Sequence, residues 1–87
     1  MYIILVYDVN VERVGRVCRY LKRYLPRVQN SVFEGELTPA KFEKMKAGLM
    51  KKMVLEDDSV LIWSLRDDQW VTRETVGKEK LPVSNFI

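Results

Sequence analysis

The chain has 87 residues and a formal net charge of +3, with one cysteine, Cys18, and no histidine. A single cysteine excludes an internal disulfide, and the lack of histidine excludes the usual zinc sites and Ser–His or Cys–His catalysis. The apolar start lacks a basic leader and no stretch approaches a membrane span, so we expect a cytoplasmic protein. The length predicts one small domain with a marginal core, which favours a homodimer.

The chain opens with a strand that ends on a carboxylate. Residues 2–8 are an apolar run rich in Ile, Val and Tyr, which predicts a central strand buried on both faces. Apolar residues at helical spacing then predict a helix over 11–25, and Pro26 ends it. Asp8 between these two elements is open to two interpretations, a helix cap or a ligand for a divalent metal ion.

The predicted helix and the residues just after it carry six cations against a single acid, Glu12. Arg16, Arg19 and Arg23 recur at intervals of three and four residues, so they form one stripe. Because Arg grips phosphate with a planar fork, the stripe favours contact with a nucleic-acid backbone over a merely solvated helix face. The predicted nucleic-acid-binding residues are Arg13, Arg16, Arg19, Arg23 and Arg27.

The second half of the chain alternates again between extended and helical patterns. Gly48 lies inside the helical part and is expected to weaken it by about 1 kcal/mol. We expect Trp63 in the core, whereas Tyr20 and Tyr24 are the aromatic residues that could stack on bases. The predicted elements are a bent strand or tight hairpin over 28–37, a helix from Thr38–Pro39 to about Met53, an exposed acidic turn over 56–59, a buried strand over 60–65 and a short strand over 70–76.

This order predicts an α+β fold of the ferredoxin-like type, β-α-β-β-α-β, with two helices on one face of a four-stranded antiparallel sheet. We expect a single domain over 1–87, with its core in about 1–66 and an added strand and tail in 67–87. The added strand has no place in the four-stranded unit, so it must lie on an edge of its own sheet or of a partner's. We predict that it joins the partner's sheet in a homodimer.

Several short motifs resemble the CRISPR-associated protein 2 family, small nucleases of the adaptation stage. The similarity covers nearly the whole chain, and the order of the elements agrees. It is strongest in the segment with the pattern Gln-x-Ser-Val-Phe-x-Gly, at the right distance from the first strand. The residues that carry it are Tyr7-Asp8 at the end of the first strand, Arg16, Arg27, and Gln29-x-Ser31-Val32-Phe33-x-Gly35.

The resemblance implies a ferredoxin-like homodimer that binds Mg²⁺, or Mn²⁺, between the two copies of Asp8. By matching position, Asp8 would be both the metal ligand and the catalytic residue. Tyr7, Ser31 and Phe33 match positions that support the active centre. The resemblance also implies a complex with the CRISPR-associated integrase during spacer acquisition, and contact with duplex DNA or single-stranded RNA.

Two classes of function therefore stay open, with a weaker third. The first is a metal-dependent endonuclease for RNA or duplex DNA, in which a metal-bound water attacks because the chain has no histidine. One carboxylate is too few for such a site, so the dimer would bring two Asp8 side chains together. The second is a non-catalytic scaffold that binds duplex DNA and bridges integrase subunits. A ferredoxin-like RNA-binding domain is weaker, because the strands lack its exposed aromatic motif.

Overall fold

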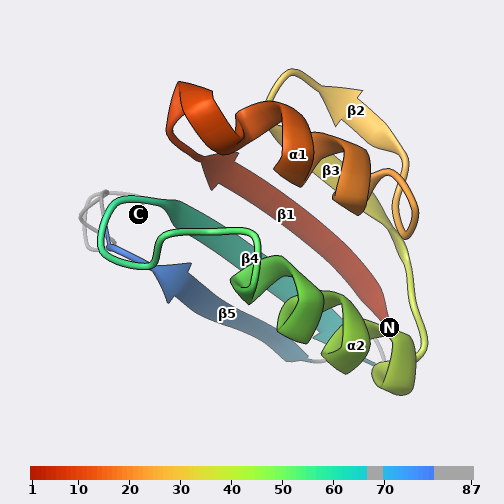
Figure 1. The fold of residues 1–87 in the computed structure, drawn as a ribbon. Helices are drawn as coiled ribbons and strands as arrows, with labels where there is room; N and C mark the ends of the chain where they lie inside the picture. Colours follow the sequence, from red (N-terminus) through yellow and green to blue (C-terminus); the bar gives the residue numbers. More distant parts are fainter. Residues whose placement is uncertain (67–69, 80–87) are drawn as a thin grey trace.

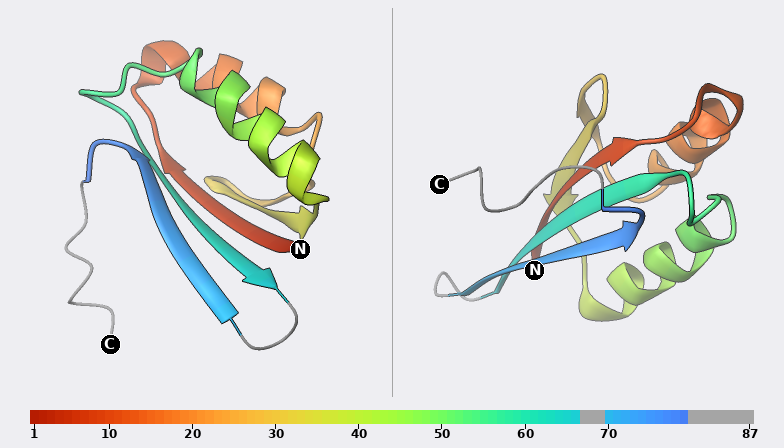
Figure 2. Two further views of the ribbon diagram at one scale, coloured as in Figure 1. Left: turned by 90° about the horizontal axis from the view of Figure 1, so that it is seen from below. Right: turned by 90° about the vertical axis from the view of Figure 1, so that its left-hand side faces the viewer.

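The computed structural model describes residues 1–66 and 70–79, which form an α+β unit (Figure 1). Both helices cover the same face of the sheet (Figure 2), and neither is long and apolar enough to cross a membrane. The elements of the described part are β1 (Tyr2–Asp8), α1 (Val11–Leu21), β2 (Arg27–Gln29), β3 (Val32–Glu36), α2 (Pro39–Met50), β4 (Ser59–Arg66) and β5 (Trp70–Gly77).

The sheet has the strand order β2-β3-β1-β4-β5, and every neighbouring pair is antiparallel. β1 is central, as its apolar run predicts, and Leu5 lies opposite both Phe33 and Ile62. The segment predicted as a bent strand or hairpin is the hairpin β2–β3. The predicted four-stranded arrangement is matched in part, because β5 extends the sheet to five strands.

β5 pairs within its own chain, and its addition to a partner's sheet stays a prediction, because an edge strand has a second side on which a partner could pair. β5 pairs with β4 of its own chain over the whole of its length, from Gly77 opposite Ser59 to Trp70 opposite Arg66. Only residues 67–69 separate the two strands, and so short a connection favours antiparallel pairing between sequence neighbours. The strand therefore lies on the edge of its own sheet, one of the two places that the sequence left open for it.

Both helices end earlier than the sequence predicts. α1 stops at Leu21, and the next residues turn more tightly, with the Arg23 N–H donating to the Tyr20 carbonyl at 3.1 Å and the Tyr24 N–H to that of Leu21 at 2.9 Å. α2 begins as predicted, with Thr38 accepting a hydrogen bond from the Lys41 N–H at 3.2 Å, and stops at Met50. Tighter turns of this kind are common at helix ends.

The core lies between the sheet and the two helices. Alternate residues of β1 point into it, including Ile3 and Leu5, both fully buried. The same alternation in β4 sends Val60 and Ile62 inward and Trp63 to the other face, where it is only half-buried. The prediction of a core Trp63 is therefore wrong. The helices contribute Val17, Tyr20 and Leu21 from α1 and Phe42, Met45 and Leu49 from α2.

The face of the sheet away from the helices, here called the open face, carries apolar side chains on its middle strands, while Glu34, Glu36 and Arg73 lie on the flanking strands. Alternation along the strands places on it the residues that are out of phase with the core. Most are half-buried, and Val71 is 64% exposed. The open face carries Ile4 and Val6 from β1, Trp63 and Leu65 from β4, and Val71 from β5.

The two helices meet where a tyrosine lies against a glycine. The Tyr20 hydroxyl donates to the Met45 carbonyl at 3.0 Å, so this side chain joins α1 to α2. A Cβ atom on Gly48 would lie 2.0 Å from the Tyr20 hydroxyl oxygen, closer than atoms can approach. Gly48 therefore has a packing role that outweighs its low helix propensity.

Candidate functional site

Asp8 is the last residue of β1 and is exposed. It lies opposite Ser59 of β4, and it is out of phase with the buried Tyr7 beside it. Alternation along the strand therefore places the Asp8 carboxylate on the open face, next to the apolar side chains described above. In this position a metal ligand would be accessible to solvent in the single chain. It would also lie close to any molecule that packs on the open face.

Tyr7 points the other way and holds the segment that follows β2. Its N–H donates to the Ser31 carbonyl at 3.0 Å, and its hydroxyl donates to the Asn30 carbonyl at 2.8 Å. Burial raises the pKa of Tyr7, so the hydroxyl stays protonated and keeps donating. The Phe33 ring lies 5.9 Å from the Tyr7 ring, centroid to centroid, and is fully buried.

Arg27 contacts the same segment from β2. Its Nη2 donates to the Asn30 carbonyl at 2.9 Å, the acceptor that Tyr7 also uses. The fold thus brings Tyr7, Ser31, Phe33 and Arg27 together behind the end of β1. Because Tyr7 and Phe33 are buried, their geometry suits support of the strand end rather than direct contact with a ligand.

Asp58 corrects the prediction of an exposed acidic turn, because it is fully buried. Its Oδ2 accepts from Arg13 Nε at 2.7 Å and from the Val54 N–H at 2.9 Å. Its Oδ1 accepts from the Asn10 N–H at 2.9 Å and from Arg13 Nη2 at 3.0 Å. The hydrogen bonds from Arg13 outweigh desolvation and hold the pKa of Asp58 well below its usual range.

The backbone of Asp58 also meets the end of β5. Its carbonyl accepts from the Lys78 N–H at 2.7 Å. The preceding Gly77 has a φ of 87°, and a Cβ atom there would lie 2.2 Å from that carbonyl oxygen. Only glycine adopts this conformation readily, so the approach depends on its missing side chain. One buried residue thus joins the start of α1, the turn before β4 and the end of β5.

This ion pair separates Arg13 from the other predicted nucleic-acid-binding residues. The Arg13 side chain is 17% exposed and is held by Asp58. No sequence pattern pointed to the contact, since the two residues are 45 positions apart and an acidic run is typical of an exposed turn. The stripe residues are exposed as predicted, Arg16 and Arg19 on α1 and Arg23 just after its end.

The three stripe residues line a hollow of about 210 Å³ on the outer side of the helices. Its other lining residues are Tyr20 and Lys52, so the segment after α2 adds a fourth cation. Every ion pair between described residues involves Arg13, Lys46 or Arg73, and none involves a cation of the hollow. The hollow is therefore a concentration of positive charge without an acid of its own.

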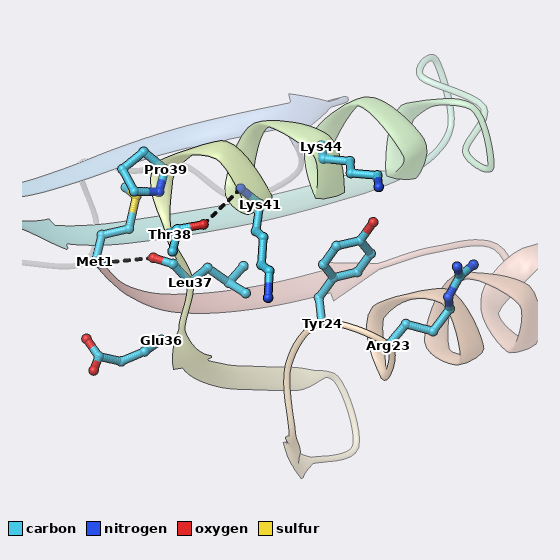
Figure 3. A pocket seen from close by; sticks show the side chains of 9 residues that line it. All are labelled: Met1, Arg23, Tyr24, Glu36, Leu37, Thr38, Pro39, Lys41 and Lys44. Atoms are coloured by element: carbon cyan, nitrogen blue, oxygen red, sulfur yellow. Dashed lines mark hydrogen bonds between the residues drawn. The ribbon is translucent and has the colours of Figure 1, made fainter.

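A larger groove of about 570 Å³ continues from the hollow, because Arg23 lines both. Figure 3 shows Lys41 and Lys44 extending from α2 over the gap toward Tyr24, while Glu36 points away from it. The groove is lined by Met1, Arg23, Tyr24, Glu36, Leu37, Thr38, Pro39, Lys41 and Lys44. The positive surface thus spans both helices, although only the first helix predicted it.

The fold does not bring Asp8 and the stripe together. Asp8 lies on the open face, whereas the stripe lies on the far side of the helices that cover the other face (Figure 2). The described residues contain no group of three His, Cys, Asp or Glu side chains placed to hold a metal. One chain thus offers Asp8 alone, which does not make a complete Mg²⁺ site without further oxygen ligands.

The comparisons with known proteins agree with this fold. Residues 1–73 match the family model of CRISPR associated protein Cas2. The "CRISPR-associated endoribonuclease Cas2" of Thermococcus kodakarensis is 52% identical over 87 residues, which is all of both chains. The protein of the same name from Thermotoga maritima is 42% identical over 80 residues, 92% of each chain.

Solved structures give the same result. A crystal structure of Cas2 is 50% identical, with a TM-score of 0.71 over 100% of this chain and 98% of that one. The crystal structure of Streptococcus pyogenes Cas2 at pH 6.5 is 35% identical, with a TM-score of 0.69 over 78% of this chain and 89% of that one. The chain therefore belongs to the Cas2 family of CRISPR-associated proteins.

Proposed function

We propose that this protein is a CRISPR adaptation-stage endonuclease that cuts phosphodiester bonds in RNA or duplex DNA and needs Mg²⁺ or Mn²⁺. The observation that carries the proposal is the exposed carboxylate of Asp8 at the end of the central strand. The relatives named as endoribonucleases, alike over the full length of the chain, support it. The exposed cations of the hollow supply the means to hold a polyanion.

The active form in this proposal is a ferredoxin-like homodimer that packs through the open face. Half-buried apolar residues such as Val6 and Leu65 are a surface that a second copy would cover favourably. Asp8 lies on the same face, so the packing would bring two carboxylates toward each other. The pair would supply the second ligand that one chain lacks.

The roles of the chain's own residues follow from their positions. The stripe holds the phosphate backbone by charge, which carries no sequence information. Tyr7 and Arg27 fix the segment behind the strand end, and so fix the direction of Asp8. A bound metal ion would supply the activated water that a protein without histidine must obtain elsewhere.

Asp8→Asn tests the enzyme. The amide keeps the shape of the side chain but removes the charge that a divalent ion needs. We expect cleavage in Mg²⁺ or Mn²⁺ to be lost while binding to duplex DNA and RNA in EDTA persists. Glu56→Gln, an exposed acid on a turn, is the matched control and should cut at the normal rate. Cleavage by Asp8→Asn at the wild-type rate would remove Asp8 from the reaction.

A second candidate function is a non-catalytic scaffold that binds duplex DNA and bridges subunits of the CRISPR-associated integrase during spacer acquisition. The separation of Asp8 from the positive surface favours it, because DNA held on the helices need not reach Asp8. We expect Asp8→Asn to support integrase assembly at the normal level. A wild-type protein that assembles but never cuts would leave the scaffold as the function.

A further inference from the structure

We propose that Lys52 and the ring of Tyr20 complete a preformed seat for one phosphate group of a nucleic-acid backbone, together with Arg16, Arg19 and Arg23. The inference rests on the proposed function, in which the outer surface of the helices holds nucleic acid. It adds a residue from outside α1 to the binding surface, and it gives Tyr20 a positioning role. In this role the Tyr20 ring packs under the cations and holds them in place, and it does not stack on bases.

The floor of the seat is fixed. Tyr20 is 7% exposed, and its hydroxyl donates to the Met45 carbonyl at 3.0 Å. The absence of a side chain on Gly48 makes room for that hydroxyl. Burial, with the neighbouring Tyr24, raises the pKa of Tyr20 to about 12, so the ring stays neutral and its hydroxyl stays a donor.

Two cationic side chains lie over the Tyr20 ring. Lys52 Nζ lies 4.8 Å from the centroid of the Tyr20 ring, and Arg23 Cζ lies 5.9 Å from it. A cation over an aromatic face is attracted to the ring quadrupole, so both heads are held over the hollow. Lys52 is half-buried, whereas the adjacent Lys51 is exposed and does not line the hollow.

The remaining wall comes from two arginines. The Arg19 side chain extends along α1 to Gly15, where an added Cβ would be in ordinary contact with Arg19 Nη1, at 3.5 Å. Arg16 stands one turn earlier on the same side of α1. Four cations thus converge on one hollow of about 210 Å³ without an acid to neutralise them.

The chemistry of the lining selects the ligand. Four cations this close together repel one another, and an anion bound between them offsets the repulsion energy. The planar guanidinium groups of the three arginines match phosphate oxygens better than a point charge does. No Asn, Gln, Asp or Glu side chain lines the hollow, so it lacks the amide and carboxylate groups that read adenine and cytosine edges. The seat therefore suits a backbone phosphate of any sequence.

Lys52→Ala tests the proposal against Lys51→Ala, its exposed neighbour. The probes are a duplex DNA and a single-stranded RNA of mixed sequence, titrated in EDTA at several salt concentrations. We expect Lys52→Ala to weaken binding about threefold to fivefold, as for one surface charge contact. The log–log salt slope for the duplex should fall by about 0.9, the value for one phosphate. Lys51→Ala should change neither quantity.

Variants of Tyr20 test its positioning role. Tyr20→Leu removes the ring and should reproduce the change in salt slope seen with Lys52→Ala. Tyr20→Phe keeps the ring and should lose less affinity than Tyr20→Leu. Circular dichroism reports whether either variant is folded. Lys52→Ala leaves every core side chain in place, so the proposal stays testable even if Tyr20→Leu does not fold.

The outcomes separate this inference from the proposed function. If Arg16→Ala with Arg19→Ala leaves binding unchanged, the surface does not hold nucleic acid and both fall. If that pair matters but the Lys52 and Lys51 variants behave alike, only the seat is overturned. If calorimetry shows that inorganic phosphate binding depends on Lys52 while nucleic-acid affinity does not, the hollow is a site for free phosphate, which also overturns it.

Discussion

The open face of the sheet and the outer surface of the helices expose different kinds of side chain. The open face carries apolar side chains such as Ile4 and Val6 on its middle strands, with the carboxylates of Asp8, Glu34 and Glu36 around them. The helix surface carries the stripe together with Lys41 and Lys44 of α2, and none of these cations makes an ion pair between described residues. Each surface therefore suits one task, association of apolar faces on one side and retention of a polyanion on the other.

The same contrast exists within one helix. Arg13 and Arg16 are three residues apart, yet Arg13 is held by a buried acid and Arg16 is exposed. Arg13, at the start of α1, thus stabilises the fold, whereas the cations farther along the chain belong to the binding surface. Variants at these positions should divide between stability and affinity.

The largest effect is expected at Asp58. Asp58→Ala leaves Arg13 without its partner and removes the acceptor of two backbone N–H groups. Breaking a buried pair from one side costs about 3–5 kcal/mol, so we expect a loss of that order in the free energy of unfolding by urea. Glu56→Ala, on the exposed turn, should stay within about 0.5 kcal/mol. An Asp58 variant as stable as wild type would return Arg13 to the binding surface.

The Asp58 carboxylate also makes the stability of the fold depend on pH in the acid range. Its pKa in the folded state lies below the unfolded value, so the unfolded state binds a proton first as the pH falls. The stabilisation is therefore complete above the unfolded pKa, about 3.9, and decreases below it. Urea unfolding at pH 3 and pH 6 should show this decrease in the wild type. Asp58→Asn should show less of it.

A smaller effect is expected where the helices meet. Gly48→Ala places a methyl group on the Tyr20 hydroxyl, and such overpacking costs about 1–3 kcal/mol. Gly15→Ala is the matched control, because it is also helical but its new methyl group would reach only the end of Arg19, at 3.5 Å. We expect the control to gain up to about 1 kcal/mol from helix propensity. Equal stability of the two variants would contradict the close contact.

Substitutions in the stripe should lower the affinity for nucleic acid without changing the stability of the fold. Replacing Arg16 and Arg19 together by Ala should weaken binding to duplex DNA by about tenfold, a change of about 1.4 kcal/mol, and lower the log–log salt slope by about 1.8. The loss should be similar for different sequences, because backbone contacts carry no base information. If the double variant loses as much free energy of unfolding in urea as it loses in binding free energy, these residues stabilise the fold, as Arg13 does.

The smallest effect is expected where α2 meets β5. Lys46 lies 2.9 Å from Glu74 and 3.4 Å from Glu43, and these pairs outweigh burial and raise its pKa. A partly exposed pair contributes about 0.5 kcal/mol, so Lys46→Ala should lose roughly that in urea unfolding. Because the folded pKa is raised, this stabilisation is present below about pH 10 and lost above it. Nucleic-acid affinity should be unchanged, since Lys46 does not line the hollow.

The sequence predicted those features that depend on neighbouring residues. The central strand, the start of the first helix at residue 11, the start of the second at Thr38, and the stripe all follow from local periodicity or capping, although the cap of α1 is Asn10 and not Asp8. The burial of Asp58 depends instead on Arg13, far away in the chain, and local pattern cannot show such a pair. Lys52 was missed for the same reason, because only the packing of α2 on α1 places it over Tyr20.

The approach of Gly77 to Asp58 has a consequence for how the chain can vary. Positions 13, 58 and 77 come from three distant segments but serve one contact, so substitutions among them should not be additive. Once Asp58 is replaced, part of the loss from a second change at Arg13 has already occurred. A double-mutant cycle between Arg13 and Asp58 would measure that shared energy, and Gly77 should tolerate replacement only in chains where the loop before β4 has moved.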